Sequence, residues 1–187
     1  MIDVDYCQTM AKYNQWMNRR LYALCADLSD GDRRQDRGAF FKSIHGTLNH
    51  LLYGDRAWLR RFTHQPLTGL AIGQDLYENF DELRQAREQC DKEILIWVQR
   101  ITADWLAQPF TFHSKADGKA HTLPTWTLVV HLFNHQTHHR GQITTLLSQL
   151  GLDPGVTDLP WLPDLATAVG AGIVGADIGA PSVDPSL

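Results

Sequence analysis

The sequence predicts an all-α protein: an antiparallel four-helix bundle with long crossover connections and a short β-hairpin before the last helix. Three observations predict this fold class. Four long stretches repeat their apolar residues at the spacing of an amphipathic helix. The segments between them are too polar, or too rich in glycine and proline, to supply another extended core element. Helices of this kind bury their apolar faces against one another, which produces a bundle.

The chain of 187 residues is long enough to bury a full core as one domain. We expect the bundle to occupy residues 1–163. Beyond it the chain is rich in alanine, glycine and proline and has no amphipathic pattern, so residues 164–187 are predicted to form a C-terminal tail. The long connections allow crossovers as well as simple up-and-down winding, and the sequence leaves that topology open.

The first two helices are predicted over residues 5–27 and 41–63, where apolar side chains recur on one face. Residues 29–38 between them are too highly charged to belong to the core. The second helix carries Asp55 in its apolar stripe. A buried carboxylate must find a cation or hydrogen-bond donors, so Asp55 needs a partner from another helix.

The third helix is predicted over residues 80–102, after a crossing loop over residues 64–79 that contains proline and glycines. Residues 109–123 alternate apolar and polar side chains around Asp117-Gly118, which is the signal for a short β-hairpin. The fourth helix opens at Pro124 and closes at Gly151.

Charge and composition exclude several classes of partner. The formal net charge is −4, with acidic and basic residues interspersed, so no basic surface for nucleic acid or membrane is expected. Cys7, Cys25 and Cys90 form no CxxC pair and are predicted to be reduced thiols. We expect no export signal, because residues 1–5 have neither a basic nor an apolar run, and no apolar run approaches the ~20 residues that span a bilayer. We expect a soluble, cytoplasmic protein that acts on a small molecule.

Histidines are concentrated in the fourth helix, where four of the nine fall within one nine-residue run. Residues four apart lie on one face of a helix, so His131 with His135, or His135 with His139, could share a metal ion. A helical wheel turns His135 and His139 toward the core side and leaves His131 and His138 at its edge. The core side is marked by Leu128, Leu132, Ile143, Leu146 and Leu150.

A third ligand must come from another helix, because bundles build metal sites from facing helices. The third predicted helix contains no histidine, and the second contains His45 and His50. His50 lies midway along that helix on the flank of the apolar stripe, whereas His45 lies near its start and projects to the outer side. Periodicity alone leaves this choice open.

Three segments resemble the DinB/YfiT-like family of metal-binding four-helix-bundle proteins, the damage-inducible DinB family. They are YNQWMNRRL over residues 13–21, SIHGTLNHLLYGDRAW over residues 43–58 and NHQTHHRGQ over residues 134–142. The resemblance covers roughly residues 5–163. It implies a divalent metal held by three histidines, which map onto the positions His50, His135 and His139.

Three imidazoles around zinc or nickel, with iron or manganese as alternatives, leave at least one coordination position open. An open metal can lower the pKa of bound water to about 7 or hold a thiol as its thiolate. Members of the superfamily that the sequence resembles include transferases and isomerases that use a low-molecular-weight thiol. The leading hypothesis is therefore a metal-dependent thiol transferase or detoxification enzyme, with such a thiol as cosubstrate.

Two residues are candidates for catalytic roles beside the metal. Asp55 is expected to act as an outer partner of the ligands or as a general base, and Gln142 to orient bound water or substrate. Arg140 is interpreted as a surface ion pair. Trp126 and Phe133 fall away from the core stripe on the wheel, so we expect them to form a homodimer contact.

Two further hypotheses stay open. One is metal-assisted hydrolysis, in which metal hydroxide replaces thiolate as the nucleophile. The other is a metal-binding or stress-response protein without turnover, which would take up metal tightly and accelerate no thiol conjugation.

Overall fold

The computed structural model describes residues 1–70, 73–114, 117–163 and 165. The chain divides into two compact units, residues 1–157 and 158–187. All the long helices and the hairpin belong to the first unit, and the second begins with a short 3-10 helix, Leu159–Trp161. Apart from residue 165, the tail expected over residues 164–187 lies outside the described residues.

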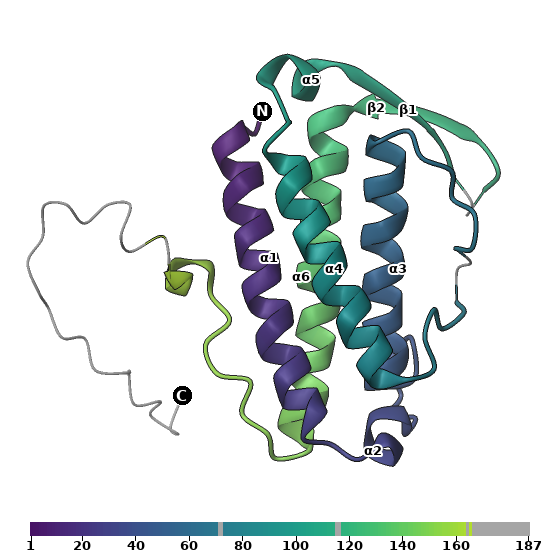
Figure 1. Cartoon of the computed structure of the whole chain (residues 1–187), viewed down its shortest axis with the longest axis vertical. Coiled ribbons are helices and arrows are strands. Elements are labelled where there is room, and N and C mark those ends of the chain that lie inside the picture. The colour runs from purple at the N-terminus through teal and green to yellow at the C-terminus, as the bar shows by residue number, and fades with distance from the viewer. Residues whose placement is uncertain (71–72, 115–116, 164, 166–187) are drawn as a thin grey trace, which may run out of the picture. The chain divides into compact units, whose positions relative to one another are not determined.

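Four long helices pack side by side, which confirms the predicted helical bundle (Figure 1). They are α1 (Val4–Ala26), α3 (Ile44–Phe62), α4 (Phe80–Val98) and α6 (Thr125–Gln149). The connection between α3 and α4 returns along the length of the bundle, so these two helices run in the same direction (Figure 1). The crossover that the long connection allows is therefore present.

Side-chain caps fix where the helices begin. Asp3 accepts a hydrogen bond from the backbone N–H of Tyr6 at 2.7 Å, and the Ser43 hydroxyl accepts one from Gly46 at 3.0 Å. The second helix begins three residues later than predicted, because Phe40 and Phe41 lie in a turn and Ser43 caps the helix. Caps at Ser29 and Thr102 also start two short helices that the sequence reading missed, α2 (Asp30–Arg34) and α5 (Ala103–Ala107).

The predicted hairpin is confirmed. Strand β1 (Pro109–His113) pairs antiparallel with β2 (Ala120–Pro124), and Thr111 lies opposite Thr122 in the register. The start of β1 is joined to the start of α6. The N–H of Thr125, the first residue of α6, donates to the carbonyl of Gln108, which precedes β1, at 2.9 Å. The hairpin and α5 therefore close one end of the bundle over α6 (Figure 1).

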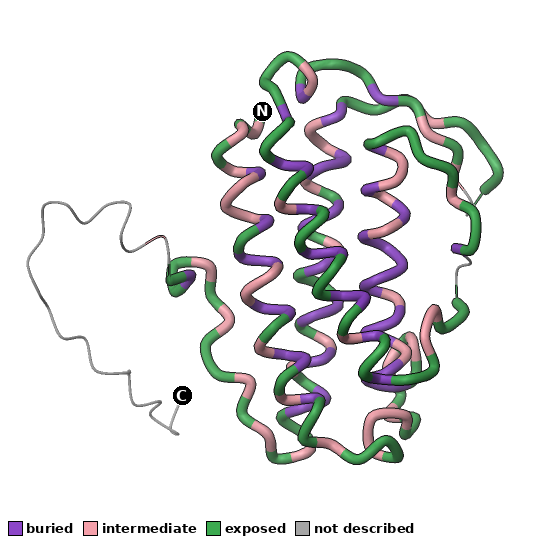
Figure 2. Tube along the Cα trace, in the orientation of Figure 1, coloured by how far each residue is buried: buried purple, intermediate pink, exposed green. Residues whose placement is uncertain are grey.

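The core lies along the inward faces of the four long helices (Figure 2). Phe133 is only 1% exposed and Trp126 is partly buried against the same core. The expected dimer contact through these two residues is therefore wrong for Phe133. Helix α6 packs against α1 and α3 as well as against α5 and β2, so its buried face is wider than the single stripe of the wheel. A homodimer formed through another surface stays a prediction.

A network of buried charges joins the helices inside the bundle. Arg87 on α4 forms ion pairs with Asp55 on α3 at 2.7 Å and with Asp91 on its own helix at 2.9 Å. Asn18 on α1 donates to Asp91 at 3.0 Å. The cation expected for Asp55 is therefore Arg87, and the pair is fully buried.

Arg140 on α6 completes the network. It is 3% exposed, and its guanidinium donates to the side-chain oxygen of Asn14 on α1 and lies over the ring of Tyr13. The interpretation of Arg140 as a surface ion pair is wrong, because the buried amides of α1 and α6 satisfy its charge instead.

The helices of the described part of the chain are not suited to a bilayer, since none combines the length and the apolar composition that a membrane span requires.

Candidate metal centre

Three imidazoles converge between α3 and α6. His50 comes from α3, and His135 and His139 lie one turn apart on α6. One ring nitrogen from each lies within 4.8 Å of the other two, and the Nε2 atoms of His50 and His135 are 2.9 Å apart. The three residues singled out from the sequence therefore form one cluster.

The spacing fits a metal ion. Two nitrogens bound at 2.0–2.1 Å to a tetrahedral zinc ion lie roughly 3.3 Å apart. The His50–His135 separation of 2.9 Å is within a few tenths of an ångström of that value. A ring nitrogen of His139 lies within 4.8 Å of the other two, so the three-histidine group could hold a metal ion.

The imidazoles are neutral at physiological pH, as ligands must be. Burial, and after it the neighbouring His139, lower the pKa of His50 to about 4. Burial, and after it His139 and His50, lower the pKa of His135 to about 3. The pKa of His139 is also lowered by burial. Each ring therefore keeps one nitrogen lone pair free for coordination.

Gly54 allows the two helices to approach at the centre. A β-carbon at this position would lie 2.8 Å from Cε1 of His135, closer than real side chains come. The sequence reading missed this residue. A glycine inside a helix costs about 1 kcal/mol relative to alanine, so its presence one turn after His50 was the available signal.

Phe41 forms one wall of the centre. Its ring stacks on His50 with centroids 3.7 Å apart and meets His139 edge-on at 5.4 Å. The sequence reading placed Phe41 at the start of a helix, whereas it lies in the turn before the Ser43 cap. The contact fixes the plane of the His50 ring, because stacking leaves it little freedom to rotate.

Gln142 lies behind one of the candidate ligands. The Nδ1–H of His139 donates to the side-chain oxygen of Gln142 at 2.7 Å. This hydrogen bond leaves Nε2 of His139 as the nitrogen with a free lone pair. The structure thus gives Gln142 a contact with a ligand, while its expected action on water or substrate stays a prediction.

Asp55 follows Gly54 but belongs to the core network. Its carboxylate is 0% exposed, pairs with Arg87 and accepts a hydrogen bond from Asn14 at 3.5 Å. Both of these partners contact Oδ2 of the carboxylate, and its role as a general base stays a prediction.

Two further histidines lie beside the cluster. The ring of His131 is 5.8 Å from that of His135 and 5.2 Å edge-on from Trp58. The exposed ring of His138 is 4.8 Å from that of His139. Neither belongs to the group whose ligand atoms converge.

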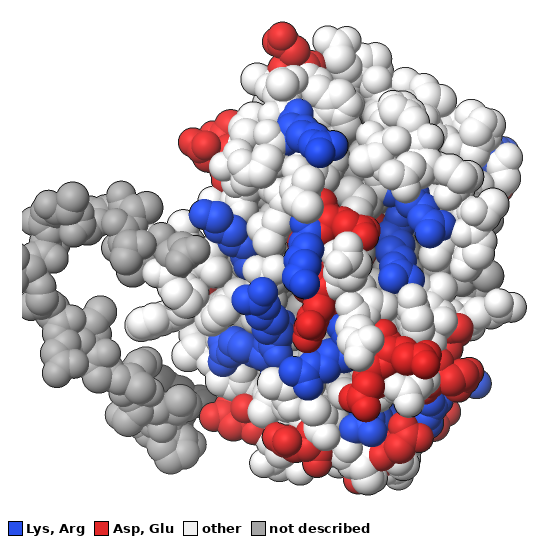
Figure 3. Space-filling model, viewed as in Figure 1, with Lys and Arg blue, Asp and Glu red and all other residues white. Residues whose placement is uncertain are grey.

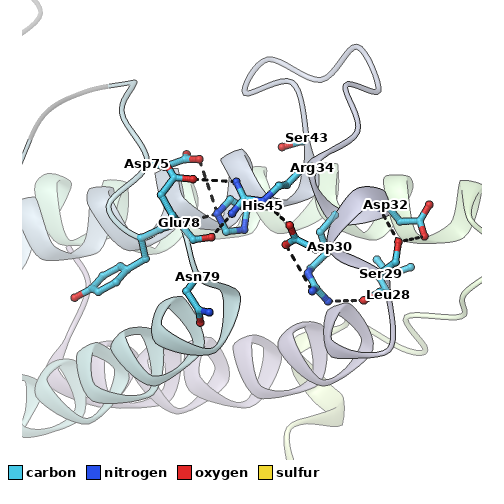
Figure 4. Close-up of polar contacts among 12 residues, drawn as sticks. Leu28, Ser29, Asp30, Asp32, Arg34, Ser43, His45, Asp75, Glu78 and Asn79 are labelled. Atoms are coloured by element: carbon cyan, nitrogen blue, oxygen red, sulfur yellow. Dashed lines mark hydrogen bonds and ion pairs between the residues drawn. The ribbon is translucent and has the colours of Figure 1, made fainter.

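His45 instead contacts the connection between α3 and α4. It is 1% exposed, so its expected outward orientation is wrong. Its Nε2 donates to the carbonyl of Tyr77 at 2.9 Å and lies 3.8 Å from the carboxylate of Asp75 (Figure 4). Asn49, one turn later, accepts hydrogen bonds from the N–H groups of Leu76 and Tyr77. The crossing connection covers this side of α3, which a wheel cannot show.

A cavity of about 810 Å³ lies beside His50, between the start of α3 and the crossing connection. Phe41 and Tyr53 supply apolar walls, and the lining carries charges of both signs, from Arg34 and Lys42 and from Asp36, Asp75 and Glu78. Arg34 is itself paired with Asp30 and Glu78 (Figure 4). The volume is that of a small-molecule site, so a ligand could reach the candidate metal centre from the His50 side.

The fold and the site define a class: a four-helix-bundle protein with three converging imidazoles on two of its helices. The chain belongs to the DinB family, whose model matches residues 1–174. It is 26% identical over 160 residues to Protein DinB of Bacillus subtilis (strain 168), covering 82% of this chain and 91% of that protein. It is 34% identical over 61 residues to the uncharacterized protein YrdA of the same organism, covering 32% and 35% of the two chains.

Proposed function

We propose that the protein is a metal-dependent transferase that joins a low-molecular-weight thiol to a carbon electrophile. His50, His135 and His139 would hold the metal, with zinc or nickel as the favoured ion. One observation carries the proposal: three neutral imidazoles converge beside a cavity large enough for a small molecule. A site with three protein ligands keeps a position open, which is typical of catalytic centres and not of structural ones.

The metal, when bound, supplies positive charge that favours the thiolate form of the cosubstrate. Side chains beside the metal site orient the histidine ligands. Gln142 fixes the His139 ring by its hydrogen bond, and Phe41 fixes the His50 ring by stacking. In the transfer, the thiol sulfur forms a bond to carbon, the bond from that carbon to its leaving group breaks, and the S–H proton goes to solvent.

Elemental analysis and metal titration test the site itself. The purified protein is compared with His50→Ala, His135→Ala and His139→Ala, and with His138→Ala as a matched control from the same helix. We expect each of the first three to lose metal and the control to keep it. Full metal content in any one of the three variants would remove that residue from the site.

An activity measurement tests the reaction. The metal-loaded protein is incubated with monochlorobimane and a panel of small thiols, and formation of the thioether is followed by fluorescence. We expect the wild type to accelerate conjugation and His135→Ala to leave it at the uncatalysed rate. Hydrolysis of an ester or amide panel without any thiol would favour a metal-dependent hydrolase. Tight metal uptake without acceleration of either reaction would favour a non-catalytic metal-binding or stress-response protein.

A further inference from the structure

A second cavity, of about 610 Å³, lies between the C-terminal parts of α3 and α4 and the crossing connection. It shares no lining residue with the cavity beside His50 and contains none of the three clustered histidines. Its volume falls within the range of about 300–1,000 Å³ that is usual for small-molecule sites. The function proposed for the metal centre does not involve this cavity.

The lining of this second cavity is positively charged. Arg56, Arg60 and Arg100 contribute three guanidinium groups, whereas Glu93 contributes a single carboxylate. That carboxylate also accepts a hydrogen bond from Gln89 at 2.9 Å. An excess of positive charge is notable in a chain with net charge −4, and Figure 3 shows basic side chains over α3 and α4 on this face. The cavity therefore favours an anionic ligand.

Two of the guanidinium groups are held in place by the protein. Nη1 of Arg56 donates to the hydroxyl of Tyr77 at 3.1 Å. The central carbon of the Arg56 guanidinium, Cζ, lies 5.4 Å from the centre of the Tyr77 ring. Nη1 of Arg60 donates to the carbonyl of Thr68 at 2.8 Å. A guanidinium has five N–H donors, so these contacts orient each group and leave donors for a ligand.

Arg100 differs from the other two. It lies just beyond the end of α4 and is exposed, and no described residue accepts a hydrogen bond from its side chain or pairs with its charge. Its charge is therefore free to meet a ligand in the cavity.

Large apolar side chains form part of the remaining wall. Trp97 stacks on Phe62 with centroids 5.0 Å apart and planes 1° apart, which fixes the indole that borders the cavity. Ile96 beside it is 57% exposed, so its side chain offers apolar surface to a ligand in the cavity. A ligand with only a charged group would leave this wall uncovered.

We propose that this cavity is a second ligand site, which binds a small organic anion with a flat apolar body and a carboxylate or phosphate group. The body covers Ile96 and the exposed edge of Trp97, which is 8% exposed, and the anionic group accepts hydrogen bonds from Arg56 and Arg100. Guanidinium groups match both carboxylate and phosphate oxygens, since their planar forks form charge-assisted hydrogen bonds. The site is separate from the metal centre and does not depend on the reaction proposed there.

Binding of simple probes tests the site. Benzoate, phenyl phosphate, inorganic phosphate, benzyl alcohol and benzylamine are titrated into the full chain, with the indole N–H signals of the tryptophans followed by NMR. We expect benzoate or phenyl phosphate to bind at least tenfold more tightly than the neutral and cationic probes. Inorganic phosphate should bind more weakly than phenyl phosphate, because it lacks the apolar body. The preference between benzoate and phenyl phosphate identifies the anionic group.

Variants locate the binding. Arg100→Gln and Arg56→Gln should each weaken binding of the preferred anion at least tenfold, and Arg84→Gln on the exposed side of α4 should leave it unchanged. His135→Ala, which alters the metal centre, should also leave it unchanged. Equal binding of all the aromatic probes, an equal loss in Arg84→Gln, or loss of binding in His135→Ala would overturn the proposal.

Discussion

The backbone of Gly54 on α3 lies against the His135 ring on α6, so that a β-carbon at Gly54 would be 2.8 Å from Cε1 and 3.2 Å from Nδ1 of that ring. Gly54 is one helical turn after His50. The missing side chain therefore determines how closely the two ligand-bearing helices can approach. Any residue with a side chain here would push His135 away from His50.

Replacing Gly54 with alanine should weaken metal binding about tenfold or more, because displaced ligands lose their common point. Gly141→Ala is the matched control: it lies on α6, and a β-carbon there would meet nothing within 4 Å. Each substitution stabilises its own helix by about 1 kcal/mol, because alanine has a higher helix propensity than glycine. Competition with a chelator measures the affinities. If Gly54→Ala binds metal with the affinity of the wild type, α3 and α6 can move apart without weakening metal binding.

Removing the hydrogen bond to His139 should also weaken the metal centre. Gln142→Leu leaves Nδ1 of His139 without the acceptor that lies 2.7 Å away, so the ring loses its fixed orientation. Loss of such an outer partner costs about 10–100-fold in metal affinity. Gln142→Glu keeps an acceptor and should retain most of the affinity. If the leucine and glutamate variants bind metal equally, the hydrogen bond has no such role.

The metal-free protein should lose stability as the pH falls below about 6.5. The pKa of His50 is lowered to about 4 and that of His135 to about 3, both from 6.5. Below 6.5 the unfolded chain binds protons that the folded chain does not. The stabilisation is therefore complete above that pH and is lost as the pH falls toward the folded values.

Urea denaturation of the chelator-treated protein, from about pH 7.5 down to about pH 4.5, measures this dependence. His135→Leu removes one of the two groups and should flatten the curve. A wild-type curve that is no steeper than that of the variant would contradict the assignment of half-buried neutral imidazoles at His50 and His135.

The sequence predicts contacts within one helix better than contacts between helices. The i, i+4 spacing of His135 and His139 is fixed by helix geometry, so the wheel paired them correctly. His50 lies on the flank of α3 and reaches the cluster only because Gly54 admits a close approach, which periodicity does not encode. The family resemblance supplied His50 instead.

The helical wheel predicts the wrong burial for residues that contact segments or polar partners outside their own helix. His45 is buried by the crossing connection. Arg140 is buried because amides from two helices satisfy it, although an isolated arginine is normally placed in solvent. In each case the missing information was the position of a short or irregular segment, or of a polar partner on another helix.

The buried network predicts a large loss of stability when its central cation is removed. Arg87→Met leaves the carboxylates of Asp55 and Asp91 in the core without the guanidinium that pairs with both. All three side chains are at least 97% buried, so water cannot compensate, and breaking such a pair costs about 3–5 kcal/mol. The same change at Arg84, whose pairing with Glu88 is solvent-exposed, should cost about 0.5 kcal/mol or less.

Chemical denaturation of the two variants measures the difference. A triple variant that replaces Asp55 and Asp91 with leucine together with Arg87→Met removes every charge of the ion pairs. It should be more stable than Arg87→Met alone, because the loss in the single variant comes from the two unpaired carboxylates and not from the missing guanidinium. Equal denaturation midpoints for Arg87→Met and Arg84→Met would mean that water enters the core and solvates those carboxylates.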